Sequence, residues 1–128
     1  MSVFLKNGFT VYNLEDMSVT EQIRLFTNAS IIAGIHGAGL INMNFAPKEA
    51  IVFEIYPEYY HDSSFRIQAI AIGLKYCYMI GETIETKGIS LQDENVFVDI
   101  KKLECALSYL KDEETRTFRT FTENESYE

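Results

Sequence analysis

Apolar and polar positions follow two patterns along this chain, and together they predict strands that alternate with helices. Continuous apolar runs are typical of parallel strands that are buried on both faces, and shorter runs beside turn residues are typical of further strands. Strands are therefore predicted at residues 9–14, 30–35, 50–56, 76–80 and 95–98.

Helices are predicted between these strands from capping residues and from apolar positions three or four apart. Ser18 and Glu21 have the spacing of a capping box, in which each side chain binds the backbone of the other residue. The predicted helices begin after Ser18, run from about Gly39 to Phe45, follow Asp62 or Ser63 as far as Gly73, and follow Asp99.

Strand–helix alternation of this kind predicts an α/β fold. We expect a Rossmann-like parallel sheet of four to five strands with helices on both faces, joined by right-handed crossovers. One domain is expected over residues 1–111. Residues 112–128 are acidic, polar and without apolar period, so we interpret them as a mobile tail.

Composition limits the classes of protein that fit. A chain of 128 residues with 47% hydrophobic and 23% charged residues is typical of one soluble globular domain. A net charge of −8 argues against nucleic-acid binding. The longest apolar runs fall short of the roughly 20 residues of a membrane span, and no signal peptide is recognisable. Cys77 and Cys105 lie in apolar settings, which favours reduced thiols and a cytoplasmic location.

The first candidate site is the turn His36-Gly37-Ala38-Gly39, where a buried strand leads into a helix. Unpaired backbone N–H groups and the positive end of the helix dipole favour an anion there. We expect the N–H groups of Ala38, Gly39 and Leu40 to donate to a phosphate, with His36 as an additional donor. Alternatively, the imidazole binds a local backbone group, and the glycines allow close packing of helix and sheet.

Two more polar residues accompany this turn. Asn42 lies one turn further along the helix, where it either orients the loop or touches a nucleotide. Glu54 is a carboxylate inside the apolar run VFEIYP, near the carboxyl end of its strand. A buried carboxylate is costly unless it is paired. Glu54 therefore either forms a salt bridge or helix-cap contact, or faces a cleft and accepts hydrogen bonds from sugar hydroxyls.

Several other chemistries lack their motifs. HGAG also occurs in the oxyanion loop of lipases, but no G-x-S-x-G sequence supplies a nucleophile. The glycine order fits neither the dinucleotide fingerprint nor the Walker motif. The two histidines and two cysteines lack zinc spacing, and no Asp-x-Asp pair is present to hold a cation on a diphosphate. We therefore expect neither a metal ion nor a cofactor.

A series of motifs in order resembles the C-terminal half of glycosyltransferase family 61, which includes capsular polysaccharide biosynthesis proteins. The resemblance extends over about residues 8 to 110. It rests on Glu21 and Gln22 with Phe26, on His36 to Leu40 with Asn42, on Pro47, on Val52 with Glu54 and Ile55, and on Gly73 and Leu74 with Tyr76.

The resemblance implies a metal-independent, inverting transferase of two Rossmann-like domains (the GT-B type) that uses a nucleotide sugar and a glycan acceptor. This half would hold the donor, with His36 and Glu54 as catalytic residues and Gly37, Ala38, Gly39, Leu40 and Asn42 as substrate-binding residues. The N-terminal half is absent from the sequence, so we expect activity to need an N-terminal domain or a second copy. The alternative is a stand-alone phosphoanion-binding module, or a dimerising interaction domain that uses its sheet edge.

Overall fold

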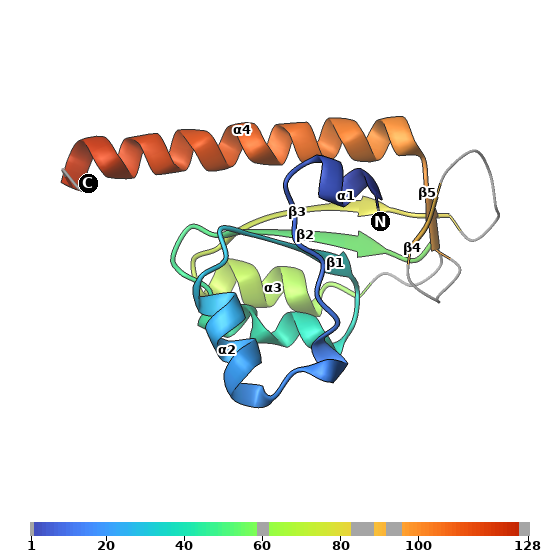
Figure 1. Ribbon diagram of the computed structural model, residues 1–128, viewed down its shortest axis with the longest axis horizontal. Coiled ribbons are helices and arrows are strands. Elements are labelled where there is room, and N and C mark those ends of the chain that lie inside the picture. Colours follow the sequence, from blue (N-terminus) through green and yellow to red (C-terminus); the bar gives the residue numbers. More distant parts are fainter. Residues whose placement is uncertain (1, 59–61, 83–88, 92–95, 126–128) are drawn as a thin grey trace.

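A computed structural model of the chain describes residues 2–58, 62–82, 89–91 and 96–125 (Figure 1). Strands and helices alternate through the central part, as the apolar pattern predicts. In chain order the elements are α1 (Ser2–Lys6), the 3₁₀ helix η1 (Leu14–Asp16), α2 (Val19–Thr27), β1 (Ile31–Ile35), the 3₁₀ helix η2 (Ala38–Phe45), β2 (Ile51–Tyr56), α3 (Ser64–Ala71), β3 (Lys75–Ile80), β4 (Ile89–Leu91), β5 (Val96–Val98) and α4 (Ile100–Glu125).

The main sheet is parallel and has the order β1-β2-β3. In this register Gly34, Glu54 and Tyr78 lie side by side across the three strands. The α/β class and the Rossmann-like parallel sheet with helices on both faces are thus confirmed. Its strand count is three in the part of the chain that the structure describes, which is below the four to five expected.

Two predicted strands lie outside this sheet. Residues 9–13 have no regular structure, and the chain then enters η1. The pattern recognised the strand propensity of these residues, but a strand also needs a partner backbone within hydrogen-bonding distance. Residues 96–98 do form β5, although it pairs antiparallel with β4 in a separate two-stranded sheet. Sequence alternation reports burial and does not identify the partner strand.

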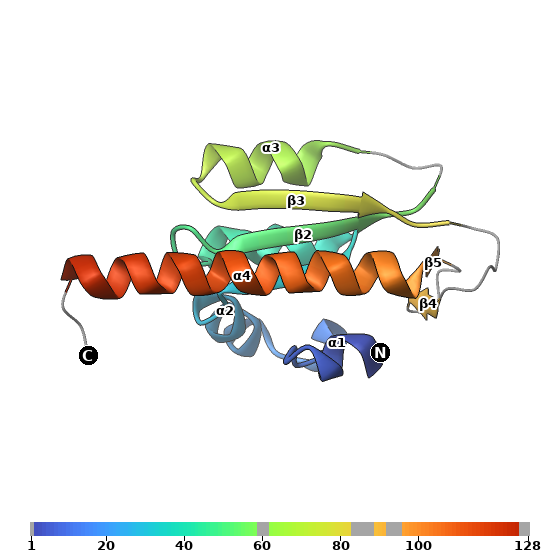
Figure 2. The ribbon, with the colours of Figure 1, turned by 90° about the horizontal axis from the view of Figure 1, so that it is seen from above.

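Helices cover both faces of the sheet, with α1 and α4 on one face and α2, η2 and α3 on the other (Figure 1). Seen from above, α4 runs along the length of the sheet (Figure 2). The buried core on the α4 face comprises Val3, Ile35, Ile51, Phe53, Ile55, Val96, Val98, Leu103, Leu107 and Leu110. The core on the opposite face comprises Phe26, Ile32, Leu40, Met43, Ala50, Val52, Ala69 and Leu74.

The predicted helix signals at α2 and α3 are confirmed. Ser18 Oγ accepts from the Glu21 N–H at 3.1 Å, and the Glu21 carboxylate accepts from the Ser18 N–H at 2.8 Å, which completes the capping box. At α3, the Asp62 carboxylate accepts from the Ser64 N–H at 2.9 Å. Gly73 follows this helix with φ +85°, a conformation that favours glycine.

The helix expected after Gly39 is a 3₁₀ helix, with a Leu40 N–H to Gly37 carbonyl bond of 3.1 Å. Its apolar positions explain this geometry. Leu40 and Met43 are buried against the sheet and Ala46 is partly buried beside them, at a spacing of three residues. A 3₁₀ helix repeats every three residues, so it places all of these positions on one face.

The last helix extends further than the sequence predicted. Asp99 caps α4 by accepting from the Lys102 N–H at 3.0 Å, and the helix continues through the boundary expected at residue 112 as far as Glu125. Residues beyond 112 lack an apolar period, but a helix that is already nucleated gains one backbone hydrogen bond for each further residue, so it can extend without an apolar stripe. Within the described residues, no helix combines the length and apolarity needed to cross a membrane.

Candidate functional site

The polar residues gather at the carboxyl ends of β1 and β2. His36 follows β1 directly, and its N–H donates to the Ile55 carbonyl at 2.9 Å, which continues the β1–β2 ladder by one residue. Glu54 lies on β2 beside Gly34. In open parallel sheets this edge is where ligands bind, because the loops that follow the strands meet there.

Glu54 is fully buried, with 0% of its side chain exposed. One carboxylate oxygen, Oε2, is bonded to His36 Nδ1, and the other, Oε1, accepts a hydrogen bond of 2.6 Å from the Tyr76 hydroxyl. The carboxylate therefore does not face a cleft as one sequence interpretation expected. Glu54 instead forms a pair, which was the other expectation from sequence, and its partner is His36. Both carboxylate oxygens have the hydrogen bonds that a buried carboxylate requires.

Aromatic side chains enclose the His36–Glu54 pair. The Tyr56 ring stacks on the imidazole with a centroid separation of 5.6 Å, and the Phe65 centroid lies 5.0 Å from it. The Tyr56 hydroxyl lies 3.1 Å from that of Tyr76. Burial and then the hydrogen bond to Glu54 raise the pKa of Tyr76 well above its ordinary value, and burial also raises the pKa of Tyr56. Both hydroxyls therefore stay protonated near neutral pH.

The sequence interpretation gave Tyr56 no role and treated Tyr76 only as part of a family motif. Strand alternation contained the missing signal, because Tyr56 lies two residues after Glu54 and so faces the same side of the sheet. Tyr76 occupies that side on the neighbouring strand. A buried carboxylate flanked by phenol groups at this spacing predicts a hydrogen-bonded cluster.

Backbone donors are present at the glycine-rich turn. The first bond within η2 is donated by Leu40, so the N–H groups of Ala38 and Gly39 precede the bonded part of this helix. The Leu40 N–H donates to the Gly37 carbonyl at 3.1 Å, and the Leu40 side chain is buried in the core. Of the three backbone N–H groups expected to bind an anion, those of Ala38 and Gly39 therefore remain candidates and that of Leu40 does not.

Gly39 also has a packing function. A Cβ atom at this position would lie 2.8 Å from Leu14 Cδ1, whereas one at Gly37 would meet only the Ile35 carbonyl at an ordinary 3.6 Å. Substitution of Gly39 therefore displaces the end of the Leu14 side chain as well as blocking a ligand. Weaker ligand binding in a Gly39 variant alone does not separate these two effects.

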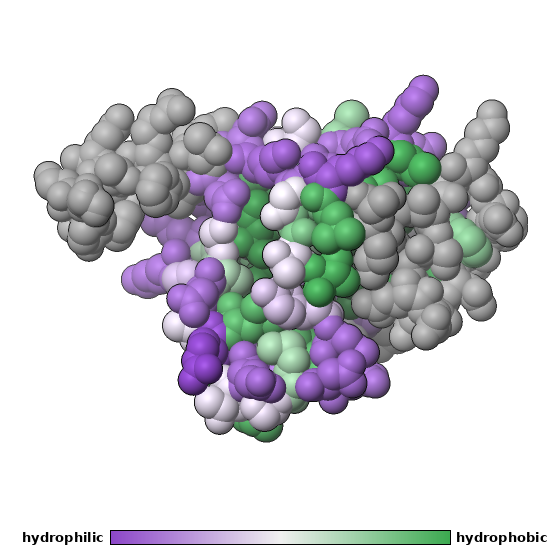
Figure 3. Space-filling model, viewed as in Figure 1, coloured by the Kyte–Doolittle hydropathy of each residue, from purple (hydrophilic) through white to green (hydrophobic). Residues whose placement is uncertain are grey.

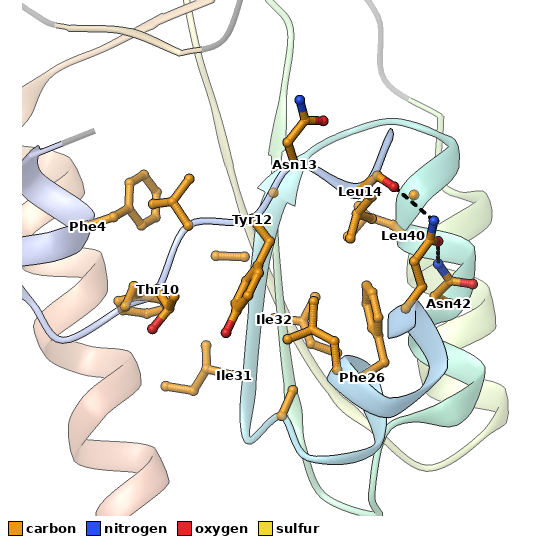
Figure 4. Close-up of a pocket in the computed structure, with 18 of the residues that line it drawn as sticks. Phe4, Thr10, Tyr12, Asn13, Leu14, Phe26, Ile31, Ile32, Leu40 and Asn42 are labelled. Carbon is orange, nitrogen blue, oxygen red and sulfur yellow. Dashed lines mark hydrogen bonds between the residues drawn. The ribbon is translucent and has the colours of Figure 1, made fainter. Parts of the chain in front are cut away.

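Asn42 orients a neighbouring loop. Its Nδ2 donates to Gln22 Oε1 at 2.8 Å, and Gln22 Nε2 donates to the carbonyls of Leu14 and Met17 at 2.9 and 3.2 Å (Figure 4). The chain of amide bonds joins η2, α2 and the segment that contains η1. Of the two sequence hypotheses for Asn42, orientation of a loop has the direct structural support.

A groove leads from this turn along the open edge of β1. Its volume is about 1570 Å³, and its wall includes His36, Gly37 and Gly39 at the turn. Further along, the wall includes Tyr12 from the segment before η1 and Ile31 from β1 (Figure 4). Figure 3 shows hydrophobic side chains gathered on this face between α4 and α2. Within the described residues, no cluster of three or more His, Cys, Asp or Glu side chains has the geometry of a metal site.

The fold and this edge define a class: an α/β domain with a glycine-rich turn and a paired histidine at the carboxyl ends of parallel strands. The family described as Glycosyltransferase 61 matches residues 1–53 of the chain. The resemblance predicted from the motifs is thus confirmed. The match includes the turn at residues 36–39 and stops one residue before Glu54, so it is shorter than the expected 8 to 110.

Curated relatives match over 45 residues, or 35% of this chain. The EGF domain-specific O-linked N-acetylglucosamine transferase of Gallus gallus is 42% identical over this stretch. The protein O-linked-mannose beta-1,4-N-acetylglucosaminyltransferase 2 is 47% identical in Xenopus tropicalis and 40% in Canis lupus familiaris. The chain spans about 8% of the length of each of these relatives.

Proposed function

We propose that this chain is the donor-binding domain of a metal-independent, inverting glycosyltransferase that uses a nucleotide sugar. The observation that carries the proposal is the turn at residues 36–39, where the N–H groups of Ala38 and Gly39 begin a helix beside His36. The groove that ends at this turn offers room for the rest of a nucleotide sugar. The family match over the same turn supports this assignment.

In the proposed reaction, an acceptor hydroxyl attacks the anomeric carbon from the face opposite the nucleotide. The bond from that carbon to the phosphate oxygen breaks, and the nucleoside diphosphate leaves with the bonding electrons. The two N–H groups and His36 stabilise the charge that develops on this leaving group. When the imidazole carries both protons, Nδ1–H donates to Glu54 and Nε2–H donates to a phosphate oxygen. A base outside this domain accepts the proton of the acceptor hydroxyl.

The names of the curated relatives suggest which donor to test first. Those relatives are N-acetylglucosamine transferases by name, so we propose UDP-N-acetylglucosamine as the first candidate donor. The acceptor in our proposal is a glycan, as in capsular polysaccharide biosynthesis. Cys77 and Cys105 are free thiols, which supports a reducing, cytoplasmic setting.

We also propose that a second domain completes the substrate cleft. The groove beside β1 exposes apolar side chains next to the turn, and a cleft between two domains would cover them. A dimer of this chain would cover the same surface. That arrangement is the alternative function, an interaction or phosphoanion-binding module without catalysis.

Calorimetric titration of the whole chain with UDP, GDP, CDP and inorganic phosphate tests the donor site. Ala38→Pro removes one proposed donor at the first helical position, where proline is tolerated, and Ala38→Ser is its matched control because it keeps the N–H. We expect one nucleoside diphosphate to bind, and we expect Ala38→Pro to lower the affinity for that ligand about tenfold. His36→Ala should lower the same affinity by about tenfold or more, as expected for loss of a charged hydrogen bond.

Two results would contradict this proposal. Equal affinities for Ala38→Pro and Ala38→Ser, together with an unchanged affinity in His36→Ala, would exclude the turn as the phosphate site. Failure of every nucleoside diphosphate to bind, together with a dimer in analytical sedimentation, would favour the interaction module.

A further inference from the structure

A hydrogen-bonded series of buried and partly buried groups continues from the His36–Glu54 pair into the sheet. The Tyr76 hydroxyl donates to Glu54 Oε1 at 2.6 Å and lies 3.1 Å from the Tyr56 hydroxyl. The Tyr56 hydroxyl has two acceptors within reach, the Tyr76 hydroxyl oxygen and, at 2.9 Å, the Asp62 carbonyl, and its single proton goes to one of them at a time. The series therefore joins β1, β2, β3 and the segment before α3 through side chains at one end of the sheet.

Strand register explains how Tyr76 reaches Glu54. Val52 is the direct neighbour of Tyr76 across the β2–β3 ladder, and Glu54 is its diagonal neighbour on the same face. A diagonal contact of this kind is within the reach of a tyrosine side chain. Its hydroxyl therefore meets the carboxylate oxygen that His36 does not use.

We propose that Tyr76 is a positioning residue that fixes the Glu54 carboxylate and, through it, the tautomer of His36. This inference rests on the proposed function, because it gives His36 a role at the departing phosphate. Tyr76 itself touches neither substrate nor reacting atoms in this proposal.

The geometry gives a physical reason for this role. Rotation about the last side-chain torsion of a glutamate meets little barrier, so a carboxylate held at one oxygen alone can swing. With Tyr76 on Oε1, Oε2 stays directed at His36 Nδ1. A carboxylate only accepts, so Nδ1 carries a proton, and in the neutral ring the lone pair is then on Nε2. Nε2 is therefore the atom that takes up the second proton, which the doubly protonated ring donates to a phosphate oxygen in the proposed function.

The surroundings of Tyr76 support a lasting donor role. Its raised pKa, caused first by burial and then by the bond to Glu54, keeps the hydroxyl protonated across the neutral and mildly alkaline range. The Tyr56 ring stacks on the imidazole at an interplanar angle of 19°. Tyr56 thus restrains the plane of the ring, while Tyr76 and Glu54 restrain its proton.

The test compares Tyr76→Phe with Tyr78→Phe in the whole chain. Tyr78 lies two residues along the same strand and is 56% exposed, and its hydroxyl has no part in the series described above, so it is a matched control. Nitrogen-15 NMR of the two histidines in the chain reads the tautomer without any ligand, and the signal that disappears in His36→Gln is that of His36. Thermal unfolding checks that each variant is folded.

We expect His36 to hold its proton on Nδ1 in the parent chain and in Tyr78→Phe, and to become a mixture of tautomers in Tyr76→Phe. UDP binding should weaken by about fivefold in Tyr76→Phe, which is less than in His36→Ala. If Tyr76→Phe is folded and its tautomer is unchanged, the positioning role is wrong, whatever the affinity.

These readouts separate the two proposals. A shifted tautomer in a chain that binds no nucleoside diphosphate would support the positioning role and contradict the proposed function. An unchanged tautomer in a chain whose UDP binding depends on His36 would overturn the positioning role and support the function.

Discussion

The two faces of β2 are equally buried but chemically different. Ile51, Phe53 and Ile55 face α4 and belong to the apolar core on that side of the sheet. Val52, Glu54 and Tyr56 face η2 and α3, and the last two of these belong to a polar series that reaches His36. Because successive side chains of β2 point to opposite faces of the sheet, the apolar core lies on one face and the candidate site on the other.

The comparison shows that the depth of burial does not distinguish a structural residue from a functional one. Phe53 and Glu54 are adjacent, with exposed fractions of 2% and 0%. Phe53 is stabilised by packing that lacks direction, whereas Glu54 is tolerated only because two donors meet its oxygens. Substitutions on the two faces should therefore differ in what they change.

The largest expected effect is on the apolar face. Phe53→Ala removes a fully buried ring and leaves a cavity, and it should lower the free energy of unfolding by about 3–5 kcal/mol, measured by urea denaturation. Phe45→Ala is the matched control, because Phe45 is 45% exposed and its loss should change stability by about 0.5 kcal/mol or less. Equal losses in the two variants would mean that Phe53 does not belong to the core of this face.

On the polar face, Glu54→Gln should lower the free energy of unfolding less than Phe53→Ala does, but it should change the hydrogen bonds to His36 and Tyr76. A glutamine keeps one acceptor oxygen but directs an amide N–H₂ at either His36 or Tyr76. We expect a loss of about 1–3 kcal/mol in unfolding free energy, the usual cost of one unsatisfied buried group. Glu104→Gln, on the exposed side of α4, is the control. An unchanged stability in Glu54→Gln would show that the polar series tolerates the loss of its charge.

These two faces were not equally predictable from sequence. Continuous apolar runs gave the three parallel strands, and capping residues gave the helix starts at Ser18 and Asp99, because both signals are local. The lone Glu54 and the turn at His36 were recognised as candidates for the same reason. Their contact, and the place of Tyr76 beside them, depend on strand order and register, which adjacent residues do not encode.

The mistaken elements have the same physical origin. Residues 9–13 have strand-like composition without a ladder partner, and β5 pairs with β4 away from the parallel sheet. The end of α4 reflects helix propagation, which needs no apolar stripe. In each case the sequence showed the local pattern. The structure that formed depended on whether a partner strand was in reach or on whether a helix was already nucleated.

The smallest expected effect sharpens the comparison through an ionisable group on the apolar face. Cys77 lies beside Phe53 in the ladder, and burial raises the pKa of its thiol from 9.0 to about 11. The folded chain therefore holds this proton more tightly than the unfolded chain does. The resulting stability is fully present below pH 9 and is lost as pH rises from 9 to about 11.

The Cys77→Ala variant should lack this loss of stability between pH 9 and about 11, whereas Cys105→Ala, at an exposed position, should retain it. At pH 8 a thiol reagent should modify Cys105 quickly and Cys77 slowly, because the thiolate is the reactive form. Equal rates at the two cysteines would show that the core between the sheet and α4 opens often enough for Cys77 to react as fast as a cysteine on the surface.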